Sequence, residues 1–588
     1  MFLYDVAVPE MGLNLTYQST KKIPIAVRIF VEVKKHLHTG FILGEPKQVL
    51  DDSIKIKDIQ GIVDERPIIQ PDLWNMALYA GRVSLCGAGA ALRVILPRPV
   101  IMGETFTKHL KPRIFNFDSR NFREKNFFNP IDSERFNFYF SELKPGERTL
   151  ILFSQKISAK KFFESLPDEL KNNALLWSSV IQKKYWDAWR DTQAGNFNLV
   201  IGTAGAIFAP FMPQKIIIED ESSPNFIIPP ILNISALTLA GHRAKFLGAE
   251  LITGGRQPSL KTFLRSNPEE KIFPERKNII LADIYHKKTR KEESKGIEGN
   301  IPLTFSLVKN TYRELMKGNS VMWILDRLGE SSEVFCSRCG EIIKCPKCGI
   351  SMTSKNDGEF LRCPICKEVR ELPPKCESCG FEVLVGRRPG LETLAEIAEK
   401  YYDKVILYTN EKVRVKKNSL ILTTRLGLDL CEKINPSLIA WLDLDLELSF
   451  PGYNTKFEVF NSLWDSYWRA REKREKNSER KILIQARKSG MKLARFLSQG
   501  WKNFFPVELN ERQEFNFPPF GYVIELEPQK PKLREKILNS FFDAGIFVMD
   551  SGDESEPLHI NAESLEPIQK VLSSINFPTK ELKITLQN

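Results

Sequence analysis

The sequence lacks the long apolar segments of a membrane protein and the most common signature of a nucleotide-binding enzyme. No apolar run reaches the roughly 18 to 20 residues that a membrane helix needs, and the best run, Ser84 to Leu96, is interrupted by Arg93. The chain also contains no Gly-Lys dipeptide, which excludes the common phosphate loop Gly-x-x-x-x-Gly-Lys-Ser/Thr. The first residues include Asp5 and have neither a basic stretch nor a sustained apolar core, unlike a secretory signal. We therefore expect a cytoplasmic protein without a membrane segment.

Cysteine is scarce outside one window of the chain. Two of the ten cysteines, Cys86 and Cys431, stand alone and are predicted to be buried thiols. The other eight form four Cys-x-x-Cys pairs, namely Cys336/Cys339, Cys345/Cys348, Cys363/Cys366 and Cys376/Cys379. Because each pair can hold one ion with two thiolates, four pairs supply two tetrahedral sulfur shells of the kind that zinc prefers. Disulfides would require an oxidising compartment, which nothing in the sequence indicates.

The spacing of these pairs indicates which of them share an ion. Fourteen residues separate Cys348 from Cys363, close to the interval of a zinc ribbon, which favours one site formed by the two inner pairs. The two outer pairs then form the second site and join the ends of the segment, as a module inserted into a host domain requires. Since a site with four cysteine ligands has no open coordination position, both zinc ions are predicted to be structural.

Length and composition favour a soluble multidomain protein. The 588 residues, 42% of them hydrophobic, can form several cores, and a chain of this length is expected to have about three to five domains. The formal net charge of +12 fits a nucleic-acid partner, but over this length the excess is modest and is weak evidence. The six histidines show no pairing with a cysteine or carboxylate that would indicate a nucleophilic triad.

Short apolar runs recur at the spacing of alternating strands and helices. Such runs read as buried strands of parallel sheets. They form a first series at Thr149–Phe153, Leu199–Ile201, Ile216–Ile218 and Leu251–Ile252, and a second at Val321–Leu325, Val405–Leu407, Leu420–Leu422, Leu438–Leu442 and Ile482–Ile484. The two series predict two parallel-sheet lobes in tandem, with the cysteine module inside the second.

Four further segments point to a known family. Val200–Phe211 is similar to a segment VIGTRSALFxPF, Ile216–Ser222 to a strand that ends in Asp-Glu-Glu-His, Pro258–Thr262 to Pro-Ser-Leu-Glu-Thr, and Glu511–Gln513 with Pro518–Phe520 to a stretch that follows a second lobe. Together with the eight cysteines, these segments resemble the PriA family of primosomal replication-restart proteins, which are bacterial superfamily 2 DNA helicases. The resemblance covers most of the chain, and the cysteine pattern is its most specific part.

The resemblance implies a domain plan and a set of site residues. It implies a β-rich domain at 1–97 that binds the 3′ end of DNA, a linker or reduced winged-helix region at 98–140, RecA-like lobes at 141–299 and 300–485, a double-zinc module at 333–383 and a small α+β domain at 486–588. The family's zinc pairing is nested, so Cys336, Cys339, Cys376 and Cys379 would hold one ion, and Cys345, Cys348, Cys363 and Cys366 the other. By the same resemblance, Gly202 and Thr203 would contact the DNA backbone.

The residues that drive ATP hydrolysis in the family are changed here at several independent positions. The Asp-Glu pair that binds Mg²⁺ and activates water reads Glu219-Asp220, which exchanges the reach of the two carboxylates. The coupling segment Gly-Ser-Ala-Thr-Pro becomes Gly254–Pro258, and in the stretch similar to the arginine-finger motif the two fingers become Ala470 and Lys473. Just before Thr149, where we expect the phosphate loop, Asn137–Gly146 offers no suitable glycines. These changes predict that Glu219 and Asp220 are relic positions and that ATP with Mg²⁺ is not a cofactor.

The resulting hypothesis is a replication-restart protein that recognises stalled or repaired forks and helps to reload the replicative helicase, without ATP-driven unwinding. By resemblance its partners would be DNA, other primosome proteins, single-strand-binding protein, and the replicative helicase or its loader. One alternative is an active 3′-5′ helicase with an unusual phosphate loop, since other backbone nests can bind phosphate. A second is a zinc-stabilised adaptor that acts only through protein contacts, which a salt-dependent preference for forked DNA would exclude.

Overall fold

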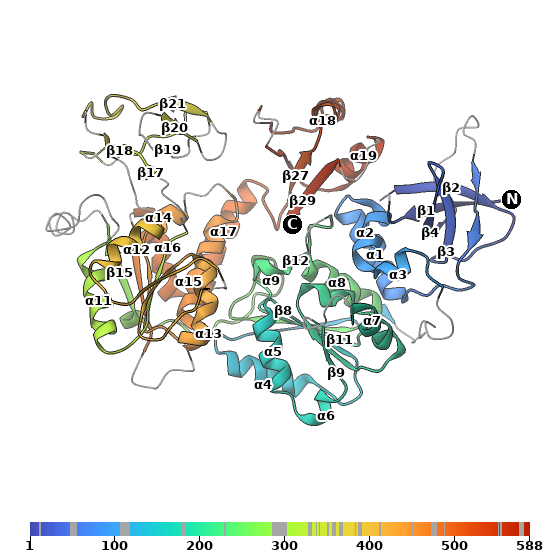
Figure 1. Cartoon of the computed structure of the whole chain (residues 1–588), viewed down its shortest axis with the longest axis horizontal. Helices are drawn as coiled ribbons and strands as arrows, with labels where there is room; N and C mark the ends of the chain where they lie inside the picture. Colours follow the sequence, from blue (N-terminus) through green and yellow to red (C-terminus); the bar gives the residue numbers. More distant parts are fainter. Residues whose placement is uncertain are drawn as a thin grey trace. The chain divides into compact units, whose positions relative to one another are not determined.

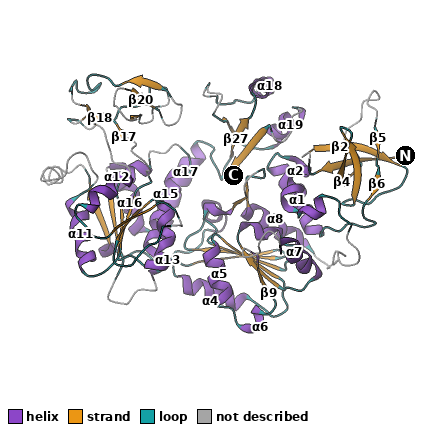
Figure 2. Ribbon diagram, viewed as in Figure 1, coloured by secondary structure: helices purple, strands orange, loops and turns teal. Residues whose placement is uncertain are grey.

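The computed structural model places several α/β domains along the chain (Figure 1), with helices and strands distributed over its whole length (Figure 2). It describes residues 1–588 except 11–12, 47–55, 106–117, 178–183, 229–230, 285–302, 327–331, 337, 340, 348, 350–351, 355–359, 364–367, 383, 386–390, 411–412, 449–451, 472–478, 487, 551, 553–555, 576–580 and 588. Residues 1–128, 134–268 and 512–588 form one compact unit, and residues 269–511 with the short segment 129–133 form a second. No helix in the described part of the chain has the length and apolarity to cross a membrane.

The N-terminal domain is a six-stranded sheet followed by helices. Its strands, in the order β5-β2-β1-β4-β3-β6, are β1 (Phe2–Val8), β2 (Leu13–Ser19), β3 (Arg28–Val33), β4 (His36–Gly44), β5 (Lys57–Asp58) and β6 (Gly61–Ile62). The helices are α1 (Pro71–Val83), α2 (Gly87–Ile95) and α3 (Arg98–Ile101). Lys34 and Lys35, at φ of 47° and 67°, form the two-residue turn between β3 and β4, and positive φ at both positions is the geometry that matches strand twist in a hairpin. The β-rich head predicted from the sequence is therefore present.

The first lobe contains a six-stranded sheet in which all neighbouring strands are parallel. In the order β7-β14-β11-β8-β10-β9, its strands are β7 (Arg123–Phe128), β8 (Thr149–Phe153), β9 (Ala174–Leu176), β10 (Leu199–Gly202), β11 (Lys215–Glu219) and β14 (Glu250–Gly255). The helices are α4 (Asp132–Glu142), α5 (Lys156–Glu164), α6 (Asp168–Lys171), α7 (Tyr185–Ala194), α8 (Ala236–Leu247) and α9 (Leu260–Ser266), and β12 (Ile227–Ile228) pairs with β13 (Ile234–Ser235). Every residue of β8, β10 and β11 is buried, so the four apolar runs of the first series are strands as predicted.

The structure differs from the sequence prediction at the start of this lobe. Residues 98–140 were assigned to a linker or a reduced winged helix, but β7 pairs with β14 in parallel from Arg123 to Phe128, and α4 packs through Tyr139 into the core of the lobe. The strand was missed because its sequence, REKNFF, is polar at its first four positions and belongs to a sheet edge. The first lobe therefore begins near residue 123.

The second lobe has the same kind of sheet. In the order β15-β26-β25-β16-β24-β23, its parallel strands are β15 (Ile279–Asp283), β16 (Val321–Ile324), β23 (Val405–Tyr408), β24 (Leu420–Thr423), β25 (Leu438–Trp441) and β26 (Lys481–Ala486). The helices are α11 (Phe305–Met316), α12 (Leu391–Glu399), α13 (Cys431–Ile434), α14 (Leu444–Glu447), α15 (Thr455–Trp468), α16 (Lys488–Gln499) and α17 (Trp501–Glu514). All five strands of the second predicted series are present. The predicted boundary between the lobes at residues 299 and 300 is wrong, because β15 pairs with β26 in the sheet of the second lobe.

Two smaller parts complete the described fold. The cysteine module, which lies between β16 and α12, has a four-stranded sheet of β17 (Ser332–Glu333), β19 (Thr353–Ser354), β20 (Phe360–Arg362) and β21 (Val369–Glu371) and a pair of β18 (Phe335–Cys336) with β22 (Leu384–Val385). The C-terminal domain pairs β27 (Tyr522–Pro528) with β28 (Leu558–Ala562) and β29 (Leu582–Gln587), and adds α18 (Pro531–Asp543) and α19 (Glu566–Ser574). Its content is mixed α+β, but the predicted start of this domain at residue 486 is wrong, because α16 and most of α17 belong to the second compact unit, which extends to Glu511.

A glutamate ties the segment that follows the first lobe to a helix of the second unit. The Glu270 carboxylate accepts hydrogen bonds from the backbone N–H groups of Trp501, at 3.0 Å, and Lys502, at 2.9 Å. These are the first residues of α17, whose N–H groups have no partner within the helix. Glu270 therefore caps α17 from a distant part of the sequence, and burial raises its pKa to about 7.

We predict that this carboxyl group makes the second unit more stable in mild acid. Because the folded-state pKa of Glu270 lies above its ordinary value near 4.5, folding favours the protonated form, and this contribution is lost as the pH rises through about 7. The melting temperature should rise as the pH falls from 8 to 5, and Glu270→Gln should flatten that rise. Calorimetry of both proteins across this pH range measures the difference, and equal pH slopes in the two proteins would contradict the assignment.

Candidate functional site

The carboxyl ends of the parallel strands in the first lobe gather the predicted site residues at one edge of the sheet. Glu219 is the last residue of β11 and is followed by Asp220, while Gly202 ends β10 and is followed by Thr203. Ligands of open α/β sheets bind at this edge, because loops and helix N-termini meet there. The structure thus brings both pairs of predicted residues to one edge of a single sheet.

Glu219 is already fully engaged by side chains of α4. Its carboxylate is almost completely buried, with 5% of the residue exposed. One oxygen, Oε1, accepts from Nε of Arg135 at 2.9 Å and lies 2.8 Å from Nη2 of the same guanidinium. The other oxygen, Oε2, accepts from the hydroxyl of Tyr139 at 2.6 Å. Burial and the nearby Glu219 charge hold the pKa of Tyr139 well above its ordinary value, so the hydroxyl remains a donor. We call these three residues the Arg135 clamp.

The clamp lies in the strand–loop–helix unit formed by β7 and α4. In nucleotide-binding proteins such a unit carries the phosphate loop, because backbone N–H groups at the helix start point toward the ligand. Here only Asn129, Pro130 and Ile131 separate the strand from the helix, and none of them is glycine. The sequence predicts this loop at Asn137–Gly146. That location was wrong, because these residues are the second half of α4 and its connection to β8.

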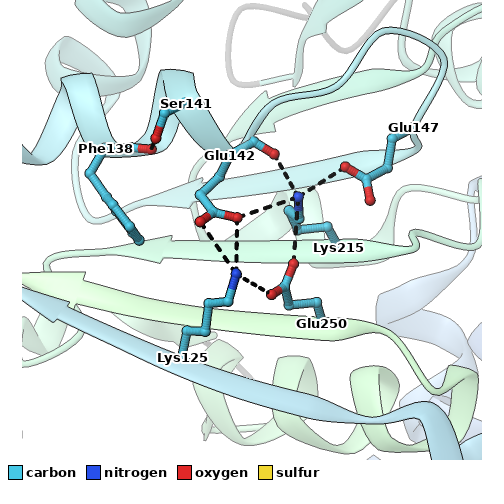
Figure 3. A network of polar contacts seen from close by, with 7 residues as sticks. All are labelled: Lys125, Phe138, Ser141, Glu142, Glu147, Lys215 and Glu250. Carbon is cyan, nitrogen blue, oxygen red and sulfur yellow. Dashed lines mark hydrogen bonds and ion pairs between the residues drawn. The ribbon is translucent and has the colours of Figure 1, made fainter.

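The far end of α4 is held by a second charged network (Figure 3). Lys215, at the start of β11, is only 1% exposed; its ammonium donates to the carbonyl oxygen of Glu142 at 2.5 Å and to the Glu147 carboxylate at 2.9 Å. It also lies 3.5 Å from the carboxylate of Glu250, which pairs with Lys125 of β7 at 2.8 Å. A buried ammonium with three carboxylates around it is well compensated. Helix α4 is therefore fixed to the sheet at both of its ends.

The two residues after Glu219 also have internal partners. Asp220 has a φ of 65° and accepts from the Ser154 hydroxyl at 2.8 Å. Glu221 accepts from the backbone N–H of Ser259 at 2.7 Å and from its hydroxyl at 3.0 Å. Burial raises the pKa of Glu221 above its ordinary value. The acidic segment at the end of β11 is thus connected to β8 and to the N-terminus of α9.

Packing around the clamp requires glycine in the neighbouring strand. A Cβ atom added to Gly254, near the end of β14, would lie 2.1 Å from the Tyr139 hydroxyl oxygen and 2.7 Å from the Phe127 carbonyl oxygen. Only glycine allows Tyr139 to reach Glu219 at this point. The acidic position is saturated by a guanidinium and a phenol, and the loop before α4 has no glycine or lysine, so these residues do not fit Mg²⁺ and a nucleotide phosphate.

The predicted DNA-contact residues lie beside this edge. Gly202 is buried at the end of β10, Thr203 is half-buried, and Gly205 is exposed. The short 3-10 helix Ala204–Phe208 follows. Backbone N–H groups in such a turn suit phosphate oxygens. The exposed part of this turn is therefore Thr203 to Gly205.

A buried arginine connects this turn to the N-terminal domain. Arg243 of α8 pairs with Asp72 of α1 at 2.6 Å, with both side chains fully buried. The same guanidinium donates to the carbonyl oxygens of Ile207, at 2.5 Å, and Ala209, at 2.7 Å. Sequence reasoning missed Arg243, because nothing in its local pattern distinguishes it from a surface arginine. Arg243 fixes α1, α8 and the end of the 3-10 helix Ala204–Phe208 to one another.

The segment compared with the arginine-finger motif is part of a packed helix. Ser466, Tyr467 and Trp468 form the last turn of α15 and are all buried. Ala470 is buried with a φ of 55°, and Lys473 lies outside the described residues. The adjacent Arg469 is 7% exposed and pairs with Asp465 at 2.7 Å and also with Asp429. The described finger position, Ala470, therefore supplies no arginine.

The outer cysteines converge into one cluster. The sulfur atoms of Cys336, Cys339, Cys376 and Cys379 all lie within 4.8 Å of one another. The closest contacts are 3.5 Å between Cys336 and Cys379 and 3.6 Å between Cys339 and Cys376. Tetrahedral zinc with bonds near 2.3 Å places its sulfurs about 3.8 Å apart, so this donor set fits one zinc ion. The pairing of Cys336 with Leu384 between β18 and β22 also joins the ends of the module, as the nested arrangement requires.

The inner cysteines are described only in part. Cys345 and Cys363 are buried, whereas Cys348 and Cys366 lie outside the described residues. At Cys363 the backbone N–H donates to the carbonyl oxygen five residues later, at 2.8 Å, and the same bond occurs at Cys336 and Cys376. Gly349 and Gly380, each four residues after a cysteine, have φ near 70° and donate to the cysteine carbonyl oxygen. The described inner cysteines, Cys345 and Cys363, thus take part in backbone hydrogen bonds of the same kind as the outer cysteines.

We predict that the Arg135 clamp contributes strongly to the stability of the first lobe. Arg135→Met should lower the free energy of unfolding by about 3 to 5 kcal/mol, because it leaves a buried carboxylate without its cation. The double variant Arg135→Met with Glu219→Met should recover most of this loss. Urea denaturation measures both effects, with Arg190→Met as the control, since its partner Asp187 is exposed and its loss should cost under about 1 kcal/mol. A single variant as stable as the parent protein would contradict a structural clamp.

Comparisons with known proteins find relatives for most of this chain. Residues 5–97 match the model of the PriA 3′DNA-binding domain. The replication restart protein PriA of Bacillus subtilis is 24% identical over 383 residues, which cover 60% of this chain and 46% of the relative. PriA of a Synechocystis species is 26% identical over 394 residues, with coverage of 60% and 46%. PriA of Thermotoga maritima is 22% identical over 473 residues, with coverage of 75% and 62%.

These matches span about half to three fifths of the length of the relatives. They include a domain model for the head and curated proteins that align with up to three quarters of this chain. The resemblance derived from the cysteine pattern and the four segments is thereby confirmed: the chain is similar to the replication restart protein PriA.

Proposed function

We propose that this protein recognises replication forks during restart and does so without ATP-driven unwinding. The observation that carries the proposal is the contrast between the N-terminal head and the acidic position of the first lobe. The head matches a domain that binds DNA 3′ ends, whereas the acidic position at the end of β11 is occupied by the Arg135 clamp. We therefore propose that the head still recognises DNA, whereas the residues at the ATPase position now serve only to stabilise the core of the lobe.

A buried arginine also connects the two parts of the first unit that we propose to bind DNA. Arg243 joins α1 of the head to the turn that contains Gly202 and Thr203 through one buried guanidinium. A fork that contacts both the head and this turn would therefore meet a preformed surface, which lowers the entropic cost of binding. Phosphate contacts at Thr203 and Gly205 would supply sequence-independent affinity, as a protein that acts at any fork requires.

The module at 333–383 holds two structural zinc ions in this proposal. The outer set fits one ion by the separation of its sulfurs, and the inner pairs share its backbone turns at Cys345 and Cys363. Closed four-cysteine sites stabilise small domains and perform no chemistry. The role of the module is then to present a rigid surface to DNA or to primosome proteins, single-strand-binding protein and the replicative helicase or its loader, in the bacterial cytoplasm.

Two assays on one preparation test the function. The protein should bind a model fork more tightly than blunt duplex, with affinity that falls steeply with salt, and forks should not stimulate hydrolysis of ATP above background. Fluorescence anisotropy measures the first quantity and phosphate release the second. The control is Glu219→Ala with Asp220→Ala: fork-stimulated turnover that vanishes in this variant would sink the proposal and support an active helicase. A protein that binds forks no more tightly than blunt duplex would instead support an adaptor that acts through protein contacts.

Metal content tests the nested zinc sites. Elemental analysis of the purified chain should give about two zinc ions per chain, with four thiolates in each site. Cys336→Ser with Cys376→Ser should remove one ion, and Cys345→Ser with Cys363→Ser should remove the other. Replacing Cys86, which belongs to no pair, with serine serves as the control and should leave the zinc content unchanged. Loss of both ions from an inner-pair variant that still folds would contradict two separate sites.

A further inference from the structure

Helix α11 of the second lobe (Figure 1) has one face that is firmly packed on the sheet. Leu307, Thr311 and Glu314 are buried, and the Trp323 indole N–H donates to the Thr311 hydroxyl at 3.0 Å. Leu307 and Trp323 belong to the apolar core on this face of the sheet. The packing fixes the rotation of the helix, so its opposite face must point to solvent.

That opposite face carries three large apolar side chains in a row. Phe305, Tyr312 and Met316 are 57%, 56% and 69% exposed. They stand seven and four residues apart, which places them on one stripe of an α-helix. Single exposed apolar residues are common, but a contiguous exposed group bordered by polar residues marks a binding surface. With a rise of 1.5 Å per residue, the stripe is about 16 Å long.

The charges along this stripe are all positive. Lys309 lies in the same row, with its ammonium 5.6 Å from the centroid of the Phe305 ring, and Arg313 is exposed beside it. The one acidic residue of α11, Glu314, faces the sheet and pairs with Lys317 at 3.3 Å. Among the described residues, Arg313 has no ion-pair partner. The exposed face therefore offers apolar rings and two cations about 6 Å apart along the helix.

We propose that this stripe, formed by Phe305, Lys309, Tyr312, Arg313 and Met316, binds single-stranded DNA. Aromatic faces stack on bases only where the bases are unpaired, and lysine and arginine pair with the phosphates between them. The proposal rests on the proposed function, because a fork supplies the single strand. It adds a contact surface in the second lobe, in a helix that none of the predicted site residues occupies.

The dimensions of the stripe favour a nucleic acid over a stable protein partner. Three partly exposed side chains offer roughly 100 Å² each, well below the roughly 800 Å² per partner of a stable protein interface. Single-stranded DNA needs no such area, since a few stacked bases and phosphate contacts are sufficient. The lack of an acidic side chain on the exposed face of α11 also matches a polyanion.

The test uses the full chain and a labelled oligothymidine of about 20 nucleotides, long enough for a typical single-strand site. Lys309→Glu with Arg313→Glu should weaken binding at least tenfold and reduce the slope of log affinity against log salt by about 1.4, or 0.7 for each lost phosphate contact. Phe305→Ala with Tyr312→Ala should weaken binding at least about tenfold while the salt slope stays constant. Affinity for blunt duplex should change less than twofold in both variants.

Matched controls come from α18. Lys532→Glu with Lys536→Glu makes the same change of net charge at two exposed lysines four residues apart, and Phe542→Ala removes an 82% exposed ring. Both should keep the parent affinity for oligothymidine. Because all four α11 side chains are exposed, unchanged melting curves should confirm that the stripe variants fold.

Three results would overturn the proposed role of the stripe. Stripe variants that bind oligothymidine as tightly as the parent protein exclude it, even if the parent binds forks and the proposed function stands. Stripe variants that change the oligomeric state in sedimentation, with unchanged oligothymidine affinity, would assign the surface to contacts between copies. A parent protein that binds neither forks nor oligothymidine would contradict the proposed function together with the stripe.

Discussion

The buried contact between Arg135 and Glu219 is the interaction on which the first lobe depends. A carboxylate in this position must have a cation, because burial without one costs several kcal/mol. In a nucleotide-dependent motor that cation is Mg²⁺, held together with phosphate. Here it is a guanidinium from α4, supported by the Tyr139 hydroxyl and by the space that Gly254 leaves. The network around Lys215 anchors the other end of the same helix, so α4 is held to the sheet at both of its ends.

In the proposed function, this arrangement separates DNA recognition from energy conversion. Arg243 connects the head to the turn at Gly202 and Thr203 through partners that involve no nucleotide. The zinc module likewise depends on its own cysteines, with the outer set drawn together in the structure. The first connection is a buried ion pair and the second is a set of converging cysteines, and neither includes a residue of the expected ATPase centre. On this basis we propose that the motor is lost while the surfaces that bind DNA are kept.

The parts of this fold that could be predicted are those whose signal lies within a short stretch of sequence. Strands such as Thr149–Phe153 and Leu438–Trp441 are wholly buried and therefore appear as continuous apolar runs. The spacing of the cysteines likewise predicted that the outer pairs come together. The strand β7 was not predicted from the sequence, because an edge strand need not be apolar. The Arg135 clamp was not predicted either, because Arg135 and Glu219 are 84 residues apart and no sequence pattern relates them. From the sequence alone, the absence of a Gly-Lys phosphate loop was visible, but the guanidinium that neutralises Glu219 was not.

The central claim is that the Arg135 clamp occupies the place of a nucleotide-bound metal ion. Isothermal titration calorimetry of the full chain with ATP and Mg²⁺ tests it most directly. The account predicts no saturable binding heat up to millimolar nucleotide, both with and without fork DNA. Saturable binding that is lost on Glu219→Gln would contradict the account, because it would show that this carboxylate still serves a nucleotide site.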